Sequence, residues 1–502
     1  MASDHLFWGD IHNHNELGCA QGGLERSYEI ARSHLDFYAF TPHGQFADGH
    51  ASEGLQIVMD RWSEIQQAAA ANYEPGRFTT FLGFEWHSFK WGDRHVLFLD
   101  DDHSMQLAPT LADLHSQLRS QNAIVIPHHI AYQNYVDWEQ LDELLSPVIE
   151  IYSEHGCSER DIGLHQMIGH GNGPGVGAFT AQHGLALGKR FGFVAGTDNH
   201  DGYPGAYGLG LTGVRAQSNT RNAIFDAIRE RKTIAVTGDR IDVDLRAGDN
   251  GIGSVAPAAA ARELTFEVEG WDILKTVELV RNNVPVAVHT PDYSQIGDSE
   301  RTHRLRLQWG WGPIAGYQVF DWSGSLSVED GELRKVVANF CSDPFDEQRR
   351  KRIVSQDAAH CRWQSHTSRG GFITTRNSLP TCSPSDSLCL EVSGSRHTRI
   401  AVEMHCQTRK SLLATAPDWS MHPWSSTQRR DYTIGQLMAE SQAFPMERPK
   451  TWVKLHRAVP PCLYQMQGAH EMPSGPAAPA YYYLRVTQEN GQMAWTSPIW
   501  FE

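Results

Sequence analysis

The stretch FWGDIHNHNE, residues 7–16, joins a short apolar run to two histidines, His12 and His14, that are spaced two residues apart. An apolar run that ends in polar residues is typical of a buried strand leading into a loop. Because side chains alternate along an extended chain, both imidazoles are expected on one face, where a single metal ion can bind them. The pair alone leaves metal binding and an ordinary surface role equally open.

Six further apolar runs follow within the first 240 residues, with amphipathic stretches between them. The runs are DFYAFT (36–41), FTTFLGFE (78–85), AIVIP (123–127), PVIEIY (147–152), FGFVAGT (191–197) and TIAVTG (233–238). Helices are expected over 23–34, 53–73, 110–122, 137–145 and 220–232, and RHVLFLDD (94–101) predicts an extra strand in a loop excursion. This alternation predicts an α/β fold with a parallel sheet or a closed barrel.

The pattern changes after about residue 240, where short strand-like runs such as ELTFEVEGW (263–271) and RIAVEMHC (399–406) replace the helical patterns. Alternating apolar residues and frequent turn residues favour an antiparallel β sandwich. We therefore expect two domains, an α/β domain over 1–240 and a β-rich domain over 241–502. The segment near 343–386 is polar and is expected to be irregular.

Acidic residues and histidines stand at the ends of nearly all the predicted strands. In an α/β barrel these ends face one common mouth, where active sites collect. The residues found there are Asp10, His12, His14, His43, Glu85, His87, His95, His128, His129, Glu154, His155, Asp198 and His200. Of the 26 histidines, 17 lie within the first 200 residues, which indicates a site in that half. Imidazole and carboxylate groups suit Zn, Mn or Fe ions.

A carboxylate can bridge two metal ions, and two ions about 3.5–4 Å apart form a hydrolytic site around an activated water. Glu85 is a natural bridge because several histidines surround it in the predicted mouth. We therefore expect two divalent ions and a water-activating, binuclear hydrolase.

Six motifs, in order, resemble those of the PHP (polymerase and histidinol phosphatase) metallohydrolases: GDIHNHNE, TPHG, GFEW, RHVLFL, IPHH and GTDNHDG. The resemblance covers about the first 240 residues and implies a distorted (β/α)7 barrel. It also implies one ion on His12, His14 and Asp198, and a second on His95 and His128, bridged by Glu85. His43 and His200 would hold a third ion or complete the first two. The whole chain further resembles a bacterial PHP-related family with a β-rich C-terminal part.

The sequence departs from that family at two positions. The stretch ELGCAQGG (16–23) offers only Glu16 or Cys19 where the family has a ligand for a third ion, and the TDH of the family is here TPH, with Pro42 before His43. Two ions are therefore expected, and a third is left open. His128 and His129 compete for one ligand position, and we assign it to His128.

The remaining roles follow from position. Glu85 and Asp198 are expected to be catalytic as metal ligands, and His155 or His129 is expected to protonate the leaving group. Trp86, His87 and Arg94 lie near the predicted mouth, where they bind substrate or serve as ordinary packing. Phosphate binding calls for Arg or Lys, and only Lys90, Arg94 and Arg160 lie near these motifs. This favours a small-molecule ester, amide or carbamate as substrate. A PHP-type phosphoesterase and a non-catalytic metal-binding or interaction protein are the alternatives.

Composition excludes other classes. A net charge of −16 argues against nucleic acid and anionic membranes as partners. No run approaches the roughly 18 apolar residues of a membrane span. The N-terminal residues MASDHLFWGD carry no basic patch before an apolar core, so we expect no signal peptide and a cytoplasmic location. None of the eight cysteines forms a CxxC pair.

Overall fold

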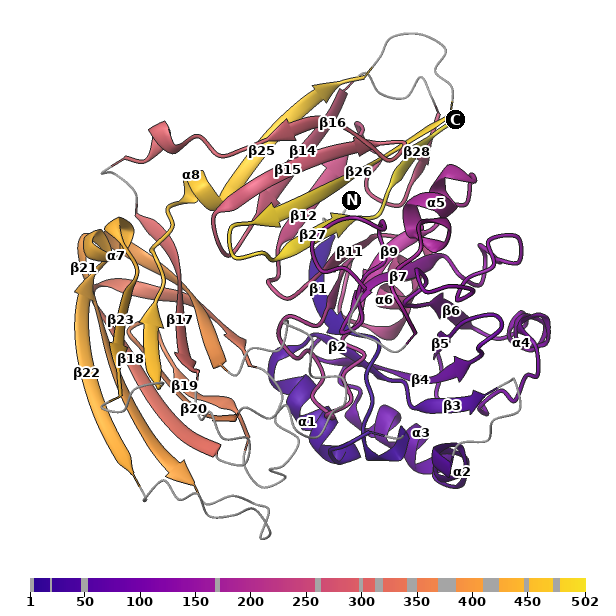
Figure 1. The fold of residues 1–502 in the computed structure, drawn as a ribbon, viewed down its shortest axis with the longest axis horizontal. Coiled ribbons are helices and arrows are strands. Elements are labelled where there is room, and N and C mark those ends of the chain that lie inside the picture. The colour runs from indigo at the N-terminus through magenta and orange to yellow at the C-terminus, as the bar shows by residue number, and fades with distance from the viewer. Residues whose placement is uncertain are drawn as a thin grey trace. The chain divides into compact units, whose positions relative to one another are not determined.

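The computed structural model describes residues 4–18, 20–46, 53–167, 172–257, 263–297, 301–311, 319–340, 350–368, 385–409, 424–446, 451–472 and 479–502. The chain forms two compact units, whose elements are labelled in Figure 1. Unit 1 consists of Met1–Gly270, Lys275–Thr290 and Met466–Glu502, and unit 2 consists of Trp271–Leu274 and Pro291–Gln465.

All seven apolar runs of the first 240 residues form strands. They are β1 (His5–Asp10), β2 (Phe37–Phe40), β4 (Thr79–His87), β6 (Ala123–Pro127), β7 (Val148–Ser153), β9 (Gly192–Ala195) and β11 (Thr233–Val236). The predicted extra strand is β5 (Arg94–Phe98), which pairs antiparallel with both β4 and β6. Among the described residues before position 240, three further strands were not predicted: β3 (His43–Phe46), β8 (Gly156–Cys157) and β10 (Leu211–Ala216).

The predicted helices are present at four of five places. They are α1 (Leu24–His34), α2 (Glu53–Asp60) with α3 (Trp62–Asn72), α4 (Leu111–Leu118) and α6 (Arg221–Arg229), and the short α5 (Ala181–Ala186) is additional. The helix expected over 137–145 is wrong, because this segment forms turns. The Asp137 carboxylate accepts the backbone N–H of Glu139, and that of Asp142 accepts the N–H of Leu144. Such local bonds compete with a helix.

The strands of unit 1 form a mixed sheet, and a closed barrel is not shown. The main sheet has the order β13-β28-β26-β27-β11-β10-β1-β2-β4-β5-β6, while β8, β7 and β9 form a separate sheet. The pairs β1–β2 and β2–β4 are parallel, whereas β4–β5, β5–β6 and β1–β10 are antiparallel. No hydrogen-bonded ladder joins β6 to β7 among the described residues. The structure thus supports a mixed α/β N-terminal part.

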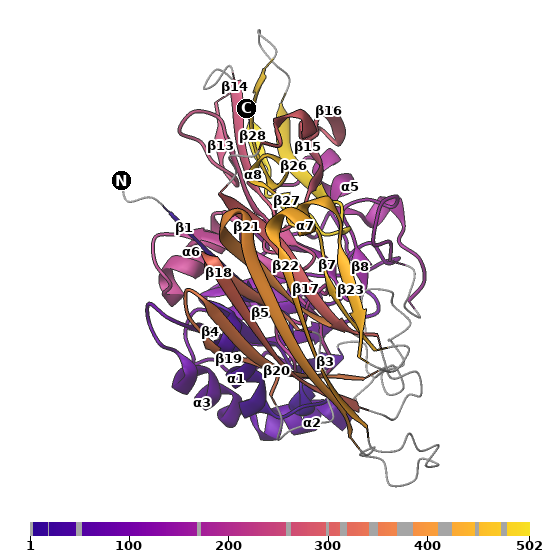
Figure 2. The same cartoon turned by 90° about the vertical axis from the view of Figure 1, so that its left-hand side faces the viewer.

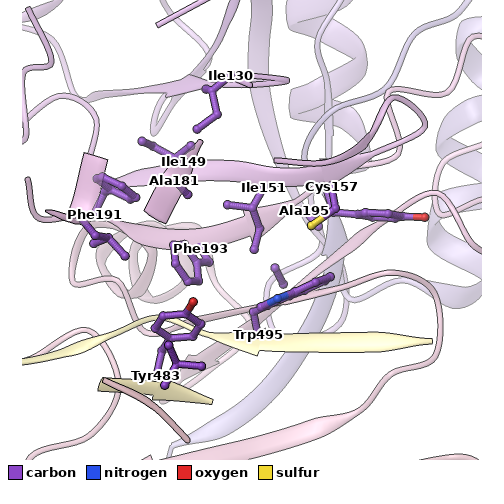
Figure 3. Packing of buried hydrophobic residues seen from close by; sticks show 14 of the residues in the cluster. Ile130, Ile149, Ile151, Cys157, Ala181, Phe191, Phe193, Ala195, Tyr483 and Trp495 are labelled. Atoms are coloured by element: carbon purple, nitrogen blue, oxygen red, sulfur yellow. The ribbon is translucent and has the colours of Figure 1, made fainter. Parts of the chain in front are cut away.

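The last strands of the chain extend the first sheet. β26 (Ala480–Gln488) pairs with β27 (Met493–Thr496) and β28 (Ile499–Phe501), and β27 pairs with β11. Trp495 and Tyr483 from these strands pack against Ile151 and Phe193 in one buried cluster (Figure 3). The division into compact units therefore differs from a single boundary at residue 240.

The other elements of unit 1 are short. β12 (Asp242–Arg246), β14 (Glu263–Glu269) and β25 (Gln465–Glu471) form a three-stranded sheet. β13 (Val255–Ala256), β15 (Leu274–Arg281) and β16 (Val284–His289) lie at the margin of the main sheet. Two 3-10 turns are η1 (Glu16–Gly18) and η2 (Gly177–Phe179).

Unit 2 is a β-rich, antiparallel unit. Its sheet contains β17 (Thr302–Gly310), β18 (Val319–Asn339), β19 (Arg352–Gln356), β20 (His360–Ser368), β21 (Ser385–Arg409), β22 (Ser425–Thr433), β23 (Gln442–Pro445) and β24 (Trp452–Leu455). Figure 2 shows the long strands β18, β21 and β22. Trp309 and Trp363 pack in its core with ring centroids 5.3 Å apart. η3 (Tyr293–Gln295), α7 (Ile434–Ala439) and α8 (Pro461–Tyr464) complete it.

Part of the segment expected to be irregular forms β19 and β20, and residues 343–349 and 369–384 lie outside the described residues. No described helix is both long enough and apolar enough to cross a membrane.

Candidate metal centre

The structure brings all eight predicted metal ligands into one cluster in unit 1, in which six are buried and His43 and His200 are half-buried. Each lies in a strand or within a few residues after one, and the polar side chains of β4 and β5 reach the cluster because Glu85 and His95 are cross-strand partners. The groups that could hold an ion include His12–His95–His128, His14–His43–His200 and His12–His14–Asp198.

The Glu85 carboxylate lies between several imidazoles. Its Oε1 is 2.9 Å from Nε2 of His128, and its Oε2 is 3.2 Å from Nε2 of His14. Oε2 is also 3.6 Å from Nε2 of His12 and 3.5 Å from Nε2 of His43. Each oxygen thus faces a different set of nitrogens, which is the arrangement that a bridging carboxylate requires.

Asp198 holds the other side of the cluster. Its Oδ1 lies 3.0 Å from Nε2 of His14 and 3.5 Å from Nε2 of His12. Its backbone is left-handed, with φ at 51°, a conformation that few residues other than glycine adopt. The backbone N–H of Asp198 donates to the carbonyl oxygen of His12, which fixes this loop against the end of β1.

The separations within the cluster fit divalent ions. Ligands that share an ion at about 2.0–2.2 Å lie about 2.8–3.6 Å apart in tetrahedral or octahedral geometry. The distances around Glu85 and Asp198 fall in this range or at its edge. His128 presents a different nitrogen to each neighbour, with Nδ1 lying 3.3 Å from Nδ1 of His95 and Nε2 facing Glu85. Glu85 Oε2 is buried without a hydrogen bond among the described residues, which is the expected state of a metal ligand.

The protonation of the cluster also suits metal binding. Burial and the neighbouring His200 lower the pKa of His14 to about 4, and burial with His129 lowers that of His128 to about 3. Burial alone would raise the pKa of Glu85, but the surrounding imidazoles, His87 first, hold it well below its usual range. Ionised carboxylates and neutral imidazoles are the forms that bind metals.

Two histidines show the opposite shift. Burial opposes protonation of His12, but Glu150 and then Asp198 raise its pKa well above the usual value. Burial likewise opposes protonation of His87, whose pKa Glu85 and Asp93 raise to about 9. The carboxylates therefore attract positive charge, which a bound cation would supply in place of these protons.

An outer layer of carboxylates orients the cluster. Nδ1 of His12 lies 3.0 Å from Oε2 of Glu150, whose pKa burial raises to about 7. The buried Asp10 accepts the Thr197 hydroxyl at 2.6 Å and the Thr197 N–H at 3.0 Å. A Cβ at Gly196 would lie 2.5 Å from Cβ of His12, so only glycine permits this approach. Such contacts fix which ring nitrogen is available to a metal ion.

The predicted proton donors His155 and His129 lie beside the cluster. Nε2 of His155 is 3.0 Å from Oδ2 of Asp198, and its Nδ1 is 3.0 Å from the Tyr132 hydroxyl. Nε2 of His129 is 3.1 Å from Oδ2 of Asp93. His129 has a left-handed backbone, with φ at 32°, which is a strained conformation.

Of the three predicted substrate-binding residues, only His87 reaches the cluster, where its Nδ1 lies 3.4 Å from Glu85. Trp86 and Arg94 are cross-strand partners on the opposite face of β4 and β5. The Trp86 Nε1–H donates to the carbonyl oxygen of Ala108, and Arg94 donates to that of Tyr135. The positions of Trp86 and Arg94 fit the packing alternative, because alternation along the strand turns both side chains away from Glu85.

Sequence reasoning missed three contributors, Asp93, Tyr132 and Glu150 as an orienting group. Asp93 stands two residues before His95, so the alternation of β5 could have indicated it. Tyr132 had no such signal. Glu16, one predicted substitute ligand for a third ion, is exposed, and Cys19 lies outside the described residues.

The chain is similar in sequence to known proteins over more than half of its length. A family model described as "Protein of unknown function (DUF3604)" matches residues 29–123 and 205–262. An uncharacterised protein of Chlamydia muridarum is 28% identical over 321 residues, which are 58% of this chain and 50% of that protein. An uncharacterised protein of Chlamydia pneumoniae is 27% identical over 320 residues, which are 59% of this chain and 50% of that protein. The chain spans about half the length of these curated relatives.

A search of solved structures finds a two-domain protein from Bacteroides vulgatus that contains a predicted PHP-like metal-dependent phosphoesterase. The match has a TM-score of 0.34 and 12% identity, and it covers 58% of this chain and 80% of that one.

Proposed function

We propose that this chain is a metal-dependent hydrolase with a binuclear site. The observation that carries the proposal is the position of Glu85, whose two buried oxygens face separate imidazoles, His128 at 2.9 Å and His14 at 3.2 Å. Two divalent ions of the Zn, Mn or Fe type would supply a water with a pKa near neutrality and would polarise the bond to be cleaved.

The proposed ligand sets follow the clusters. His12, His14 and Asp198 would hold one ion, His95 and His128 would hold the other, and Glu85 would bridge them. His43 and His200 lie beside His14, with ring centroids at 4.2 and 4.4 Å, where they would complete the first set or hold a third ion.

His155 is the proposed proton donor to the leaving group, with His129 as the alternative. Nδ1 of His155 contacts the Tyr132 hydroxyl and Nε2 of His155 contacts Asp198. The His155 ring therefore lies between a phenol that carries a proton and the cluster. A group in this position can hold a proton and pass it to a departing oxygen or nitrogen within hydrogen-bond reach.

The positions of the cations favour an uncharged ester, amide or carbamate as substrate. Arg94 is turned toward backbone carbonyls, Nζ of Lys90 lies 4.5 Å from the Trp91 ring centroid, and Nε of Arg160 lies 4.0 Å from Glu159. None of these three contacts is with a residue of the cluster. A phosphoester remains the alternative, because metal ions can themselves neutralise phosphate.

The test is a substrate panel on protein loaded with Zn or Mn. It compares p-nitrophenyl acetate, 1-naphthyl N-methylcarbamate, p-nitrophenyl phosphate and bis-p-nitrophenyl phosphate. We expect turnover of the acetate or carbamate, and loss of about 100-fold or more in Glu85→Gln, because this change removes the bridging charge. Glu267→Gln, an exposed carboxylate on β14, is the matched control and should keep full turnover.

Turnover of only the two phosphate esters would show that the chain is a phosphoesterase and not an ester, amide or carbamate hydrolase. Bound metal without turnover of any of the four compounds would favour the non-catalytic metal-binding alternative. Unchanged turnover in Glu85→Gln would contradict the role assigned to Glu85.

A further inference from the structure

Unit 2 contains a groove that shares no residue with the metal centre. Its volume is about 370 Å³, and it is lined by residues of β18, β19, β20 and β21 together with Arg350. This size is in the range of small-molecule sites, about 300–1,000 Å³. The strands that form it are labelled in Figure 2.

The register of the sheet places polar side chains together on one face. In one cross-strand row Asp321 lies opposite both His366 and Gln407, and in the next row Ser323 lies opposite Gln364 and His405. Because side chains two residues apart in a strand share a face, these rows form one continuous surface. Six lining side chains thus come from two adjacent rows.

The row between these two consists of Trp322, Ser365 and Cys406, which are all buried in unit 2, as is Trp363 two rows further along. Trp322 and Ser365 also border the groove. The indole N–H of Trp322 donates to the Thr367 hydroxyl at 2.9 Å, which fixes this layer. The polar groove therefore rests on a packed apolar layer, which makes its floor rigid.

Charge distinguishes the groove from the rest of the chain. Arg352 extends the second row, since it lies opposite Gln364, and Arg350 lines the same groove. Among the described residues that line the groove, two arginines accompany one carboxylate, Asp321, whereas the whole chain has a net charge of −16. A local cationic groove in an acidic protein concentrates anions, and guanidinium groups bind oxyanions through paired hydrogen bonds.

The uncharged lining groups add a second kind of recognition. Gln364 and Gln407 each offer an amide donor and acceptor, and Ser323 offers a hydroxyl. Asp321 can accept hydrogen bonds but would repel a bare anion. These groups match the hydroxyls of a polyol better than they match a simple inorganic ion.

We propose that this groove binds a polyhydroxylated oxyanion, namely a sugar acid or a sugar phosphate. The oxyanion contacts the arginine side of the groove, and the hydroxyls contact Asp321 and the two glutamines. This site is independent of the proposed hydrolase function, because no residue is common to the two.

The test is calorimetric titration of the full-length, metal-loaded protein with D-glucuronate, glucose 6-phosphate, D-glucose and inorganic phosphate at millimolar concentrations. We expect binding of glucuronate or glucose 6-phosphate, with the tighter of the two identifying the source of the oxyanion. Arg352→Gln should weaken it by about tenfold or more, because a charge-assisted contact is lost. Arg362→Gln, an exposed arginine that lies one row beyond the groove on the same face, is the matched control and should change affinity less than twofold.

Asp321→Asn separates hydroxyl recognition from simple anion binding. It should weaken the binding of glucuronate or glucose 6-phosphate several-fold, because a charged carboxylate that accepts from hydroxyls becomes a neutral amide with one acceptor oxygen, while it leaves the binding of inorganic phosphate unchanged or tighter. Circular dichroism of each variant checks that the sheet is intact.

Four results would overturn the proposal: no binding of either sugar anion, equal binding of neutral glucose, equal binding of inorganic phosphate, or the same loss in Arg352→Gln and Arg362→Gln.

Discussion

Nδ1 of His12 lies 3.0 Å from Oε2 of Glu150, and both side chains are buried. This contact occupies one ring nitrogen and leaves Nε2 directed at Glu85 and Asp198. An orienting carboxylate of this kind fixes the tautomer of a metal-binding imidazole and raises its basicity. Glu150 is therefore a positioning residue for the centre.

Glu150→Gln is expected to weaken metal binding by about 10–100-fold, because the amide keeps the shape but loses the charge that supports His12. Competition with a chromophoric chelator measures this affinity directly. Turnover should fall at limiting metal and recover when metal is added in excess. Glu267→Gln, the exposed control, should bind metal like the wild type, and an unchanged affinity in Glu150→Gln would contradict the positioning role.

Gly196→Ala is expected to displace His12. A Cβ at this position would lie 2.5 Å from Cβ of His12 and 2.7 Å from Oε2 of Glu150, and neither can move freely in a buried site. Metal content should drop while the protein stays folded, as elemental analysis and circular dichroism can show. Gly251→Ala, where a Cβ meets nothing within 4 Å, is the control. Full metal content in Gly196→Ala would show that metal binding does not need the close approach of Gly196 to His12.

Removal of metal should destabilise unit 1. Without cations, the buried carboxylates of Glu85 and Asp198 lose their proposed counter-charge. Binding at 1,000 times Kd stabilises a native state by about 4 kcal/mol per site, so chelation should lower Tm by several degrees. Scanning calorimetry before and after EDTA, and again after metal return, measures the change. An identical Tm in all three states would show that bound metal adds nothing to stability.

Stability at mildly acid pH should depend on His34, which lies on α1 away from the cluster. Burial and then Arg240 lower its pKa to about 4, and its Nδ1 lies 2.9 Å from the Ile30 carbonyl oxygen. Below about pH 6.5 His34 is protonated in the unfolded chain but stays neutral in the folded chain. The free energy of unfolding therefore falls as the pH is lowered to about 4.

His34→Gln should therefore show a weaker loss of unfolding free energy between pH 7.5 and pH 5 than the wild type. Urea titrations at several pH values measure this difference. His5→Gln, which removes an exposed histidine from β1, should keep the slope of the wild type. Equal slopes in wild type and His34→Gln would mean that His34 is protonated freely in the folded state.

The cluster was predictable from sequence because each candidate ligand stands at or just after a strand, and strands were the clearest pattern in the first 240 residues. The same alternation that places Glu85 in the cluster turns Trp86 away from it, which could have decided between substrate binding and packing for Trp86. Tyr132 could not be predicted, because its contact with His155 depends on how two loops meet.

The arrangement of the strands in sheets was harder to predict from the sequence than the strands themselves. β27 pairs with β11 although more than 250 residues separate them, and no local pattern near Trp495 specifies such a partner. Closure of a barrel likewise depends on whether β6 and β7 form a ladder, which their similar apolar sequences do not determine. Residues 137–145 had a helical pattern, but Asp137 and Asp142 stabilise turns there instead.

Metal content per chain tests the central claim most directly. Elemental mass spectrometry of freshly purified, untagged protein should find about two Zn, Mn or Fe ions per chain, as a carboxylate-bridged pair requires. Glu85→Gln should retain fewer, and Glu267→Gln should retain both. A protein that binds no metal, even after each ion is added back to the apoprotein, would contradict the account.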